Sequence, residues 1–312
     1  MNPRPSLPNF KRLEQRRKVT LIAGLKCRDA IVFPADSEES GGVRKSNVEK
    51  MHRVPESGMV GVLSHDPKRN TSIVVAGAGN GTLCDFAMQR ITDMVRATTK
   101  HDGALKVIEA VLIDIWKVHV PLFPAHDSTE TDFRLLIGIR APDSYGPHLY
   151  SVHGTTIVER DKYFSWGSGS VTDYILDQMY SEPMSVEDGI AAALYMLQIA
   201  KKYVSGVGGE SHISILKADG AVDDKPPWEI SEEENIATSF SQTSGALLLS
   251  LLRTRSGTEV NFINHLKAFD KTLHHLRKKK KASDKFMDEF MQHLEEQKKS
   301  AKPVEPKAEG QK

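Results

Sequence analysis

Residues 19–42 of the chain, VTLIAGLKCRDAIVFPADSEESGG, decide the fold. Two near-continuous apolar runs, 19–26 and 30–36, are joined by a short polar connection. Runs of this kind are typical of strands buried on both faces or of short buried helix segments. The β-branched residues and the short connection favour two strands. Thr20 then stands at the head of the first strand and Asp36 at the end of the second.

Strand and helix signals beyond this pair come in separate runs rather than in strict alternation. The other predicted strands are residues 59–63, 72–76, 133–140, 148–152, 156–159, 163–166 and 212–216. We expect the strands at 156–159 and 163–166 to extend the sheet that begins at residue 133. Helical periodicity covers residues 83–95, 105–115, 171–179 and 185–204, and Ser185 with Asp188 fits a capping box. Segregated runs favour an α+β fold, a four-layer αββα sandwich with a helical C-terminal extension.

Composition divides the chain into five parts, each expected to behave differently. They are a basic leader or propeptide at 1–19, a folded domain at 20–220, an acidic linker with prolines at 221–235, a helical extension at 236–298 and a disordered tail at 299–312. The extension carries a block of basic residues at 277–281, for which a solvated helix face is the expected role.

The overall composition is that of a globular protein whose net charge is too small to create a strong electrostatic field. Of 312 residues, 39% are apolar and 27% charged, and the net charge is +1. We therefore expect neither a nucleic-acid partner nor a membrane partner. Cys27 and Cys84 lie in apolar runs, which favours two buried thiols in a reducing compartment and a cytoplasmic location.

A glycine cluster at residues 77, 79 and 81 follows one predicted strand and opens a helix. The dinucleotide fingerprint requires a glycine at the position that Thr82 occupies, so a nucleotide cofactor is not expected. A tight turn is favoured, and its exposed N–H groups could stabilise an oxyanion. A metal is not expected either, because no histidine lies in a His-Glu-x-x-His arrangement and the two cysteines are far apart.

The candidate catalytic residues are distributed along the chain. They are Thr20, Asp36, Lys50, Ser168 and Ser170, and each alone has an ordinary explanation. A threonine at a strand start is usually structural, and Asp36-Ser37 also fits a turn. Spacing alone therefore does not establish an active site.

Several segments together resemble the proteasome β-subunit family. That family begins with a threonine, carries Gly-x-Lys shortly afterwards and ends its second strand in Ala-Asp-Ser; the matching positions are Thr20, Gly24, Lys26, Ala35, Asp36 and Ser37. The other similar segments follow in the family's order: KMHRV (50–54), VVAGAGNGTLCD (74–85), GPHLYSVHG (146–154), WGSGSVTDYILD (166–177) and VGGESHISIL (207–216). The resemblance spans residues 19–220.

The resemblance implies a self-processing, N-terminal-nucleophile hydrolase of the threonine type. In that chemistry Thr20 is the nucleophile and its own α-amine is the base. Lys50 supplies positive charge beside the hydroxyl, Asp36 fixes Lys50, and Ser168 contacts the amine within the turn that also holds Ser170. The backbone N–H of Gly81 stabilises the oxyanion.

The chain departs from the family pattern in three respects. Val19 precedes the threonine where the family has glycine, and Glu38 stands where it often has arginine. Val204 and Val207 occupy the places of an aspartate and a serine that normally support the nucleophile's amine. These departures put catalytic activity, but not the fold, in doubt.

The sequence therefore favours a threonine-type endopeptidase of a proteasome-like assembly, active after autocatalytic removal of residues 1–19. Two alternatives stay open: a non-catalytic structural subunit with the same fold, or a non-proteolytic amide hydrolase of the same class. The resemblance implies a homo-oligomeric ring, a peptide or unfolded-protein substrate and an ATPase or other regulatory partner. No cofactor is expected.

Overall fold

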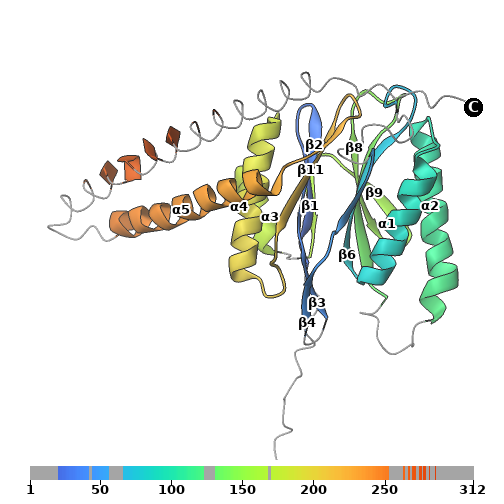
Figure 1. The fold of residues 1–312 in the computed structure, drawn as a ribbon, viewed down its shortest axis with the longest axis horizontal. Helices are drawn as coiled ribbons and strands as arrows, with labels where there is room; N and C mark the ends of the chain where they lie inside the picture. Colours follow the sequence, from blue (N-terminus) through green and yellow to red (C-terminus); the bar gives the residue numbers. More distant parts are fainter. Residues whose placement is uncertain are drawn as a thin grey trace, which may run out of the picture. The chain divides into compact units, whose positions relative to one another are not determined.

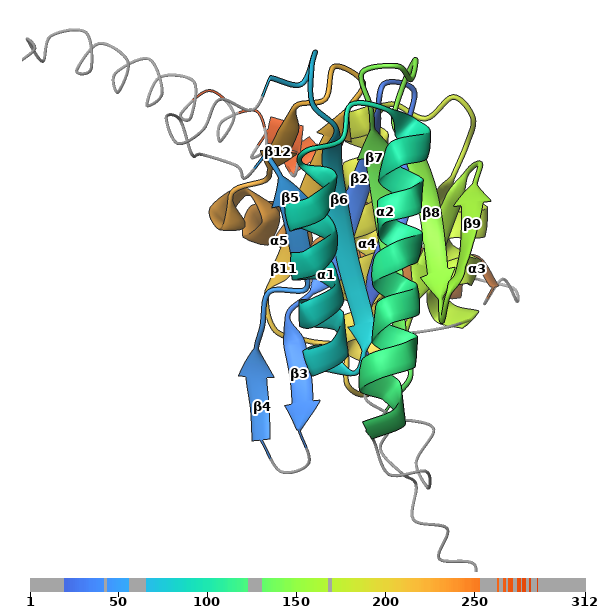
Figure 2. The ribbon, with the colours of Figure 1, turned by 90° about the vertical axis from the view of Figure 1, so that its right-hand side faces the viewer.

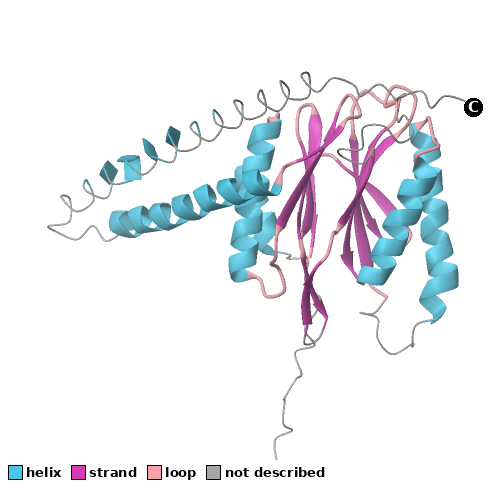
Figure 3. Cartoon of the chain, viewed as in Figure 1, coloured by secondary structure: helices cyan, strands magenta, loops and turns pink. Residues whose placement is uncertain are grey.

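The computed structural model describes residues 20–41, 44–55, 66–122, 131–167 and 170–252, with further helical residues between 263 and 285. The chain forms two compact units, Met1–Ala237 and Thr238–Lys312. In the first unit, two antiparallel sheets lie face to face and helices cover both outer surfaces, as predicted (Figure 1). Figure 3 shows these layers by secondary structure.

The first sheet carries the strands that the opening sequence predicts. Its strand order is β10-β1-β2-β11-β12. The members are β1 (Ile22–Lys26), β2 (Ala30–Asp36), β10 (Tyr163–Trp166), β11 (Ser211–Lys217) and β12 (Val222–Asp224). Every residue of β2 is buried, which explains its near-continuous apolar sequence. Past Ser37 the chain continues into a separate hairpin of β3 (Glu38–Gly41) and β4 (Arg44–Asn47).

The second sheet has the order β5-β6-β7-β8-β9. Its strands are β5 (Met51–Val54), β6 (Ser72–Gly79), β7 (Phe133–Arg140), β8 (His148–His153) and β9 (Thr156–Arg160). Successive strands are neighbours, so the sheet is a meander apart from the helical excursion between β6 and β7. The predicted strand at 59–63 lies outside the described residues.

Four helices cover the two sheets. They are α1 (Gly81–Val95), α2 (His101–Asp114), α3 (Ser170–Met179) and α4 (Val186–Tyr203). Figure 2 shows α1 and α2 side by side over the second sheet. Ser185 is confirmed as the N-cap of α4, because its hydroxyl accepts a hydrogen bond from the N–H of Asp188; the hydroxyl also donates to the Asp188 carboxylate, which in a full capping box would accept from the Ser185 N–H.

The space between the sheets is filled by side chains from both. Phe33 of β2 is fully buried there, in a cluster with Leu149 and Leu216. Gly138 of β7 leaves the room that Phe33 requires, since a Cβ at that position would lie 2.6 Å from the phenylalanine ring. This packing fixes how the two sheets face each other, and therefore where their strand ends meet.

Two predictions about the chain path are wrong. The strand at 163–166 does not extend the second sheet, because β10 pairs with β1 of the first, with Ile22 opposite Trp166. The segment 221–235 is not a linker: it contains β12 and the first turns of α5 (Pro227–Leu252). Proline is well suited to the first position of a helix, so the prolines begin α5 rather than break the chain.

Candidate active site

A buried carboxylate organises the site at the end of β2. Asp36 is fully buried, and its Oδ1 accepts hydrogen bonds from Lys50 Nζ at 2.7 Å, the Leu21 N–H at 2.8 Å and Thr20 Oγ1 at 3.1 Å. Its Oδ2 accepts from the N–H of Gly208 at 3.0 Å. Four donors on one carboxylate compensate for the loss of its hydration.

Lys50 connects the two sheets at this point. It directly precedes β5 of the second sheet, and its carbonyl accepts from the N–H of Gly77 on β6 at 3.0 Å. Its side chain is only 9% exposed and donates to Asp36 and to the Glu38 carbonyl, each at 2.7 Å. The ammonium is therefore held between a carboxylate and a carbonyl. A buried charge of this kind is tolerated only with such partners.

Thr20 lies just before β1 and is also 8% exposed. Its hydroxyl donates to Asp36. The backbone of Gly167 packs against it so closely that a Cβ on Gly167 would overlap the Thr20 carbonyl oxygen. Gly167 also has a φ of +109°, which disfavours any other residue. The sequence indicated a glycine-serine turn here but not this contact.

The loop that joins α4 to β11 contacts the other carboxylate oxygen of Asp36, Oδ2. Besides the bond from the Gly208 N–H to Asp36, the Glu38 N–H donates to the Gly208 carbonyl at 3.0 Å. Ser37 and Glu210 exchange two further bonds, of 2.9 and 2.7 Å. The loop thus holds both carboxylate oxygens in fixed directions. The resemblance to the family indicated this loop, but not its contacts to residues 36–38, which are made largely by backbone atoms.

The structure gives fewer contacts for the other predicted site residues, Gly81, Ser168 and Ser170. Gly81 is the first residue of α1, whose N-cap is Asn80. Its N–H is one of the first four of the helix, which have no intrahelical acceptor. The contacts that join Thr20, Asp36 and Lys50 do not include Gly81. Ser168 lies outside the described residues, and Ser170 is described only as the first residue of α3.

The departures at Val204 and Val207 are visible in the structure. Val207 is buried in the apolar cluster that contains α4, and Val204 packs against the same cluster. Ser205 is exposed. Among the described residues, the side chain of Asp36 accepts hydrogen bonds from Thr20, Leu21, Lys50 and Gly208, and none of these three valine and serine residues is among them. The support that an aspartate and a serine would give is therefore replaced here by apolar packing.

The two cysteines do not offer an alternative nucleophile. Both are buried, and burial, aided by nearby carboxylates, raises the pKa of Cys27 to about 12. A thiol of that pKa is almost entirely protonated near neutral pH. Within the described part of the chain, no group of three or more histidine, cysteine or carboxylate side chains could hold a metal ion. Nor does any described helix combine the length and hydropathy of a membrane span.

Comparisons with known proteins find similarity to proteasome subunits. A family model described as "Proteasome subunit" matches residues 70–216. "Proteasome subunit beta 2" of Pyrococcus furiosus is 27% identical over 216 residues, which cover 67% of this chain and 92% of that one.

Solved structures show the same fold at lower identity. The Anbu (ancestral beta-subunit) from Yersinia bercovieri is 15% identical, with a TM-score of 0.59, over 76% of this chain and 98% of that one. The Anbu of Pseudomonas aeruginosa, described as a helical assembly, is 15% identical with a TM-score of 0.55 and covers 77% of this chain. About a quarter of the present chain is thus additional to these structures.

Proposed function

The chain is a proteasome β-like protein, and on that premise we propose that it is a threonine-type endopeptidase with Thr20 as its nucleophile. The observation that supports this proposal most strongly is the hydrogen bonding of Asp36. Its Oδ1 accepts from Thr20 Oγ1 at 3.1 Å and from Lys50 Nζ at 2.7 Å. A hydroxyl, a buried ammonium and a carboxylate in mutual reach are the groups that such a nucleophile requires.

The proposed reaction begins with removal of residues 1–19. The Thr20 hydroxyl attacks the Val19 carbonyl, and the Val19–Thr20 amide bond breaks as an ester to Thr20 Oγ forms, which frees the Thr20 amine. Water then hydrolyses the ester, which releases residues 1–19 with a carboxylate on Val19 and restores the Thr20 hydroxyl. This step is needed because an amide nitrogen has no basic lone pair at neutral pH, whereas an α-amine of ordinary pKa near 8 can take the hydroxyl proton. The same amine then serves each cycle of peptide cleavage.

The other residues position charge around that nucleophile. Lys50 favours the deprotonated oxygen and amine through its positive charge. Asp36 holds Lys50 and is itself held by the loop at Gly208. The proposed oxyanion donor is the N–H of Gly81, and loss of such a donor typically costs a hundredfold or more in rate. Ser168 and Ser170 are proposed to contact the freed amine.

The assembly and substrate follow from the relatives as proposals. The matched proteins include proteasome subunits and an Anbu complex with helical assembly. We propose that this chain is likewise oligomeric, in a homo-oligomeric ring, and that it cleaves peptides or unfolded protein in the cytoplasm with an ATPase or other regulatory partner. Sedimentation of the full chain over micromolar concentrations tests the oligomer, and a persistent monomer would contradict it.

A second candidate is a non-catalytic subunit of the same fold. The burial of Val207 in the apolar cluster favours it, because a valine there cannot supply the hydroxyl that would support the amine. Val19 also favours it, since a β-branched side chain crowds the carbonyl that must be attacked.

Intact-mass analysis of the full-length purified protein separates the two functions. The peptidase predicts a species that begins at Thr20, and a Thr20→Ala variant that keeps residues 1–19. The matched control is Thr71→Ala, a buried threonine outside the site, which should process normally. Cleavage of fluorogenic peptides should appear only in the processed species. Full-length chain alone, in folded and assembled wild-type protein, would exclude the peptidase and leave the structural subunit.

A further inference from the structure

A tryptophan lies directly before the glycine that contacts Thr20. Trp166 is the last residue of β10, where it stands opposite Ile22 of β1, and Gly167 follows it. The Trp166 side chain reaches across to the second sheet, because its Nε1 donates to the Leu135 carbonyl on β7 at 3.3 Å. The position of Trp166 therefore determines how the backbone of Gly167 approaches Thr20.

Arg134 of β7 binds the Trp166 side chain. Its guanidinium carbon lies 4.7 Å from the centre of the Trp166 ring, which is a cation–π contact. Asp132 fixes the guanidinium, because its carboxylate accepts from Arg134 Nε at 3.2 Å and from Nη2 at 3.0 Å. A pair with two such bonds sets the plane of the guanidinium as well as its position. Asp132, Arg134 and Trp166 therefore form one connected set of side chains.

Asp132 also contacts the N-terminus of α1, the other element of the proposed reaction. Its carbonyl accepts from the N–H of Asn80, the N-cap of α1, at 2.9 Å. Gly79 allows this approach, because a Cβ at that position would lie 2.3 Å from the Asp132 carbonyl oxygen. Asn80 directly precedes Gly81, the proposed oxyanion donor. Asp132 therefore connects the surroundings of the nucleophile with those of the oxyanion donor.

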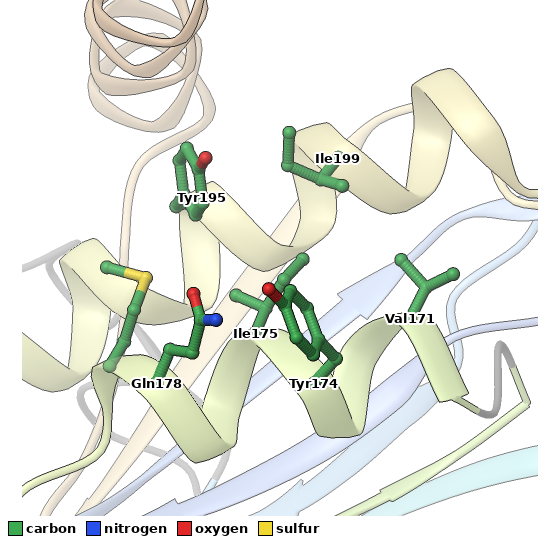
Figure 4. Close-up of a pocket in the computed structure, with 7 residues that line it drawn as sticks. Val171, Tyr174, Ile175, Gln178, Tyr195 and Ile199 are labelled. Carbon is green, nitrogen blue, oxygen red and sulfur yellow. The ribbon is translucent and has the colours of Figure 1, made fainter. Parts of the chain in front are cut away.

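Separate contacts anchor the chain on either side of Gly167. The hydroxyl of Ser165 on β10 forms a hydrogen bond of 2.9 Å with that of Thr172 on α3, and Thr172 is fully buried. Helix α3 in turn packs on α4, and Figure 4 shows side chains of both helices around the pocket that they line. Loss of the Arg134 contact should therefore shift Trp166 and Gly167 locally without unfolding β10 or α3.

We propose that Arg134 is a positioning residue for the reaction of Thr20. Its described ion pair and cation–π contact are with Asp132 and Trp166, so it acts on Thr20 through Trp166 and Gly167. An error of about 1 Å in the placement of a reacting group can cost about a hundredfold in rate, so a small shift of Gly167 has a large expected effect. The inference rests on the peptidase function proposed above.

The variant Arg134→Gln in the full-length chain tests the role of Arg134, with Arg90→Gln as the matched control. Arg90 also pairs with a carboxylate, that of Asp114 at 2.7 Å, and lies 5.4 Å from the centre of the Phe86 ring, but it links α1 to α2 and not to β10. In Arg134→Gln, kcat for fluorogenic peptides should fall about tenfold with KM within about twofold of the parent, and release of residues 1–19 should slow about as much. Arg134→Lys keeps the charge without the planar fork and should lie between the two. Arg90→Gln should match the parent.

Hydrogen exchange of the unprocessed chains, measured by mass spectrometry, tests the contact without relying on activity. Peptides that cover residues 20–26 and 163–167 should exchange faster in Arg134→Gln than in the parent, because β10 and the start of β1 lose a support. Peptides that cover β11 should exchange at the parental rate. Arg90→Gln should leave all three regions unchanged.

The outcomes separate this inference from the proposed function. A parent that neither processes nor cleaves peptides refutes the peptidase and with it the positioning role, whatever the exchange result. In an active parent, three results overturn the positioning role alone. They are rates in Arg134→Gln equal to those in Arg90→Gln, a rise in KM without a fall in kcat, which would place Arg134 in substrate binding, and exchange that is unchanged or is raised equally in every region.

Discussion

Replacement of Lys50 by methionine measures how much the buried ion pair contributes to the fold. Asp36 is 0% exposed and Lys50 8%, and their 2.7 Å contact is the closest that the carboxylate makes. Removing one partner of a buried pair leaves the other charge uncompensated, at a cost of about 3–5 kcal/mol. For a domain of this size that corresponds to a fall in Tm of about 6–20 °C.

The assay is guanidinium unfolding of the full chain at neutral pH, with thermal melting as a second measure. Lys217→Met is the matched control, because Lys217 pairs with Asp223 on the surface, where the two side chains are 45% and 52% exposed. A pair of that kind contributes about 0–1 kcal/mol. Equal unfolding free energies for the two variants would refute the buried pair as a structural element.

The Lys50→Met variant also tests the proposed role of Lys50 in self-processing. Because the Lys50–Asp36 pair is buried, any substitution of Lys50 is expected to lower stability as well as activity. Self-processing of Lys50→Met should therefore be assayed well below its own Tm. A folded variant that still releases residues 1–19 at the parental rate would contradict the role of Lys50.

Three further outcomes are expected. Gly167→Ala should prevent Thr20 from occupying its site and therefore abolish processing. The control is Gly146→Ala, where an added Cβ has no neighbouring atom within 4 Å, and it should process normally. Equal processing rates of the two variants, measured by intact mass, would contradict the close contact between Gly167 and Thr20. Burial lowers the pKa of His101, because the charged imidazolium is disfavoured away from water. The contribution of neutral His101 to stability is therefore complete above about pH 6.5, the ordinary pKa of histidine, and is lost as the pH falls through the lowered pKa. Denaturation midpoints measured from pH 7.5 to 5 should decline less in His101→Phe than in the parent. Cys27, with a pKa of about 12, should resist a thiol reagent at pH 8 until guanidinium is added, and rapid labelling of the native protein would contradict its burial.

Local sequence signals predicted the part of the site that strand ends define. Thr20 and Asp36 flank an adjacent strand pair, so short-range order is enough to bring them together. Lys50 is predicted by resemblance, and the structure places its ammonium 2.7 Å from Asp36 Oδ1, while its catalytic role stays a prediction. Residue patterns could not show that Gly167 must touch Thr20, because that contact depends on β10 pairing with β1 across more than a hundred residues.

The segment after β11 shows why composition misleads at domain edges. Acidic residues and two adjacent prolines usually indicate an exposed connection. Here Val222 and Ile230 are buried, so the same segment contributes one strand and one helical turn to the core. Tertiary contacts, which composition does not report, decide between the two structures.

The start of α5 sets a limit on where the chain can be shortened. Ile230 is packed among residues of α4, and Glu234 pairs with Lys201 and accepts from Ser211. A chain cut at residue 220 would lose these contacts and also β12, which covers the edge of β11. An uncovered strand edge of that kind readily pairs with other chains. A fragment that keeps these contacts therefore has to extend past Glu234, close to the end of the first compact unit at Ala237.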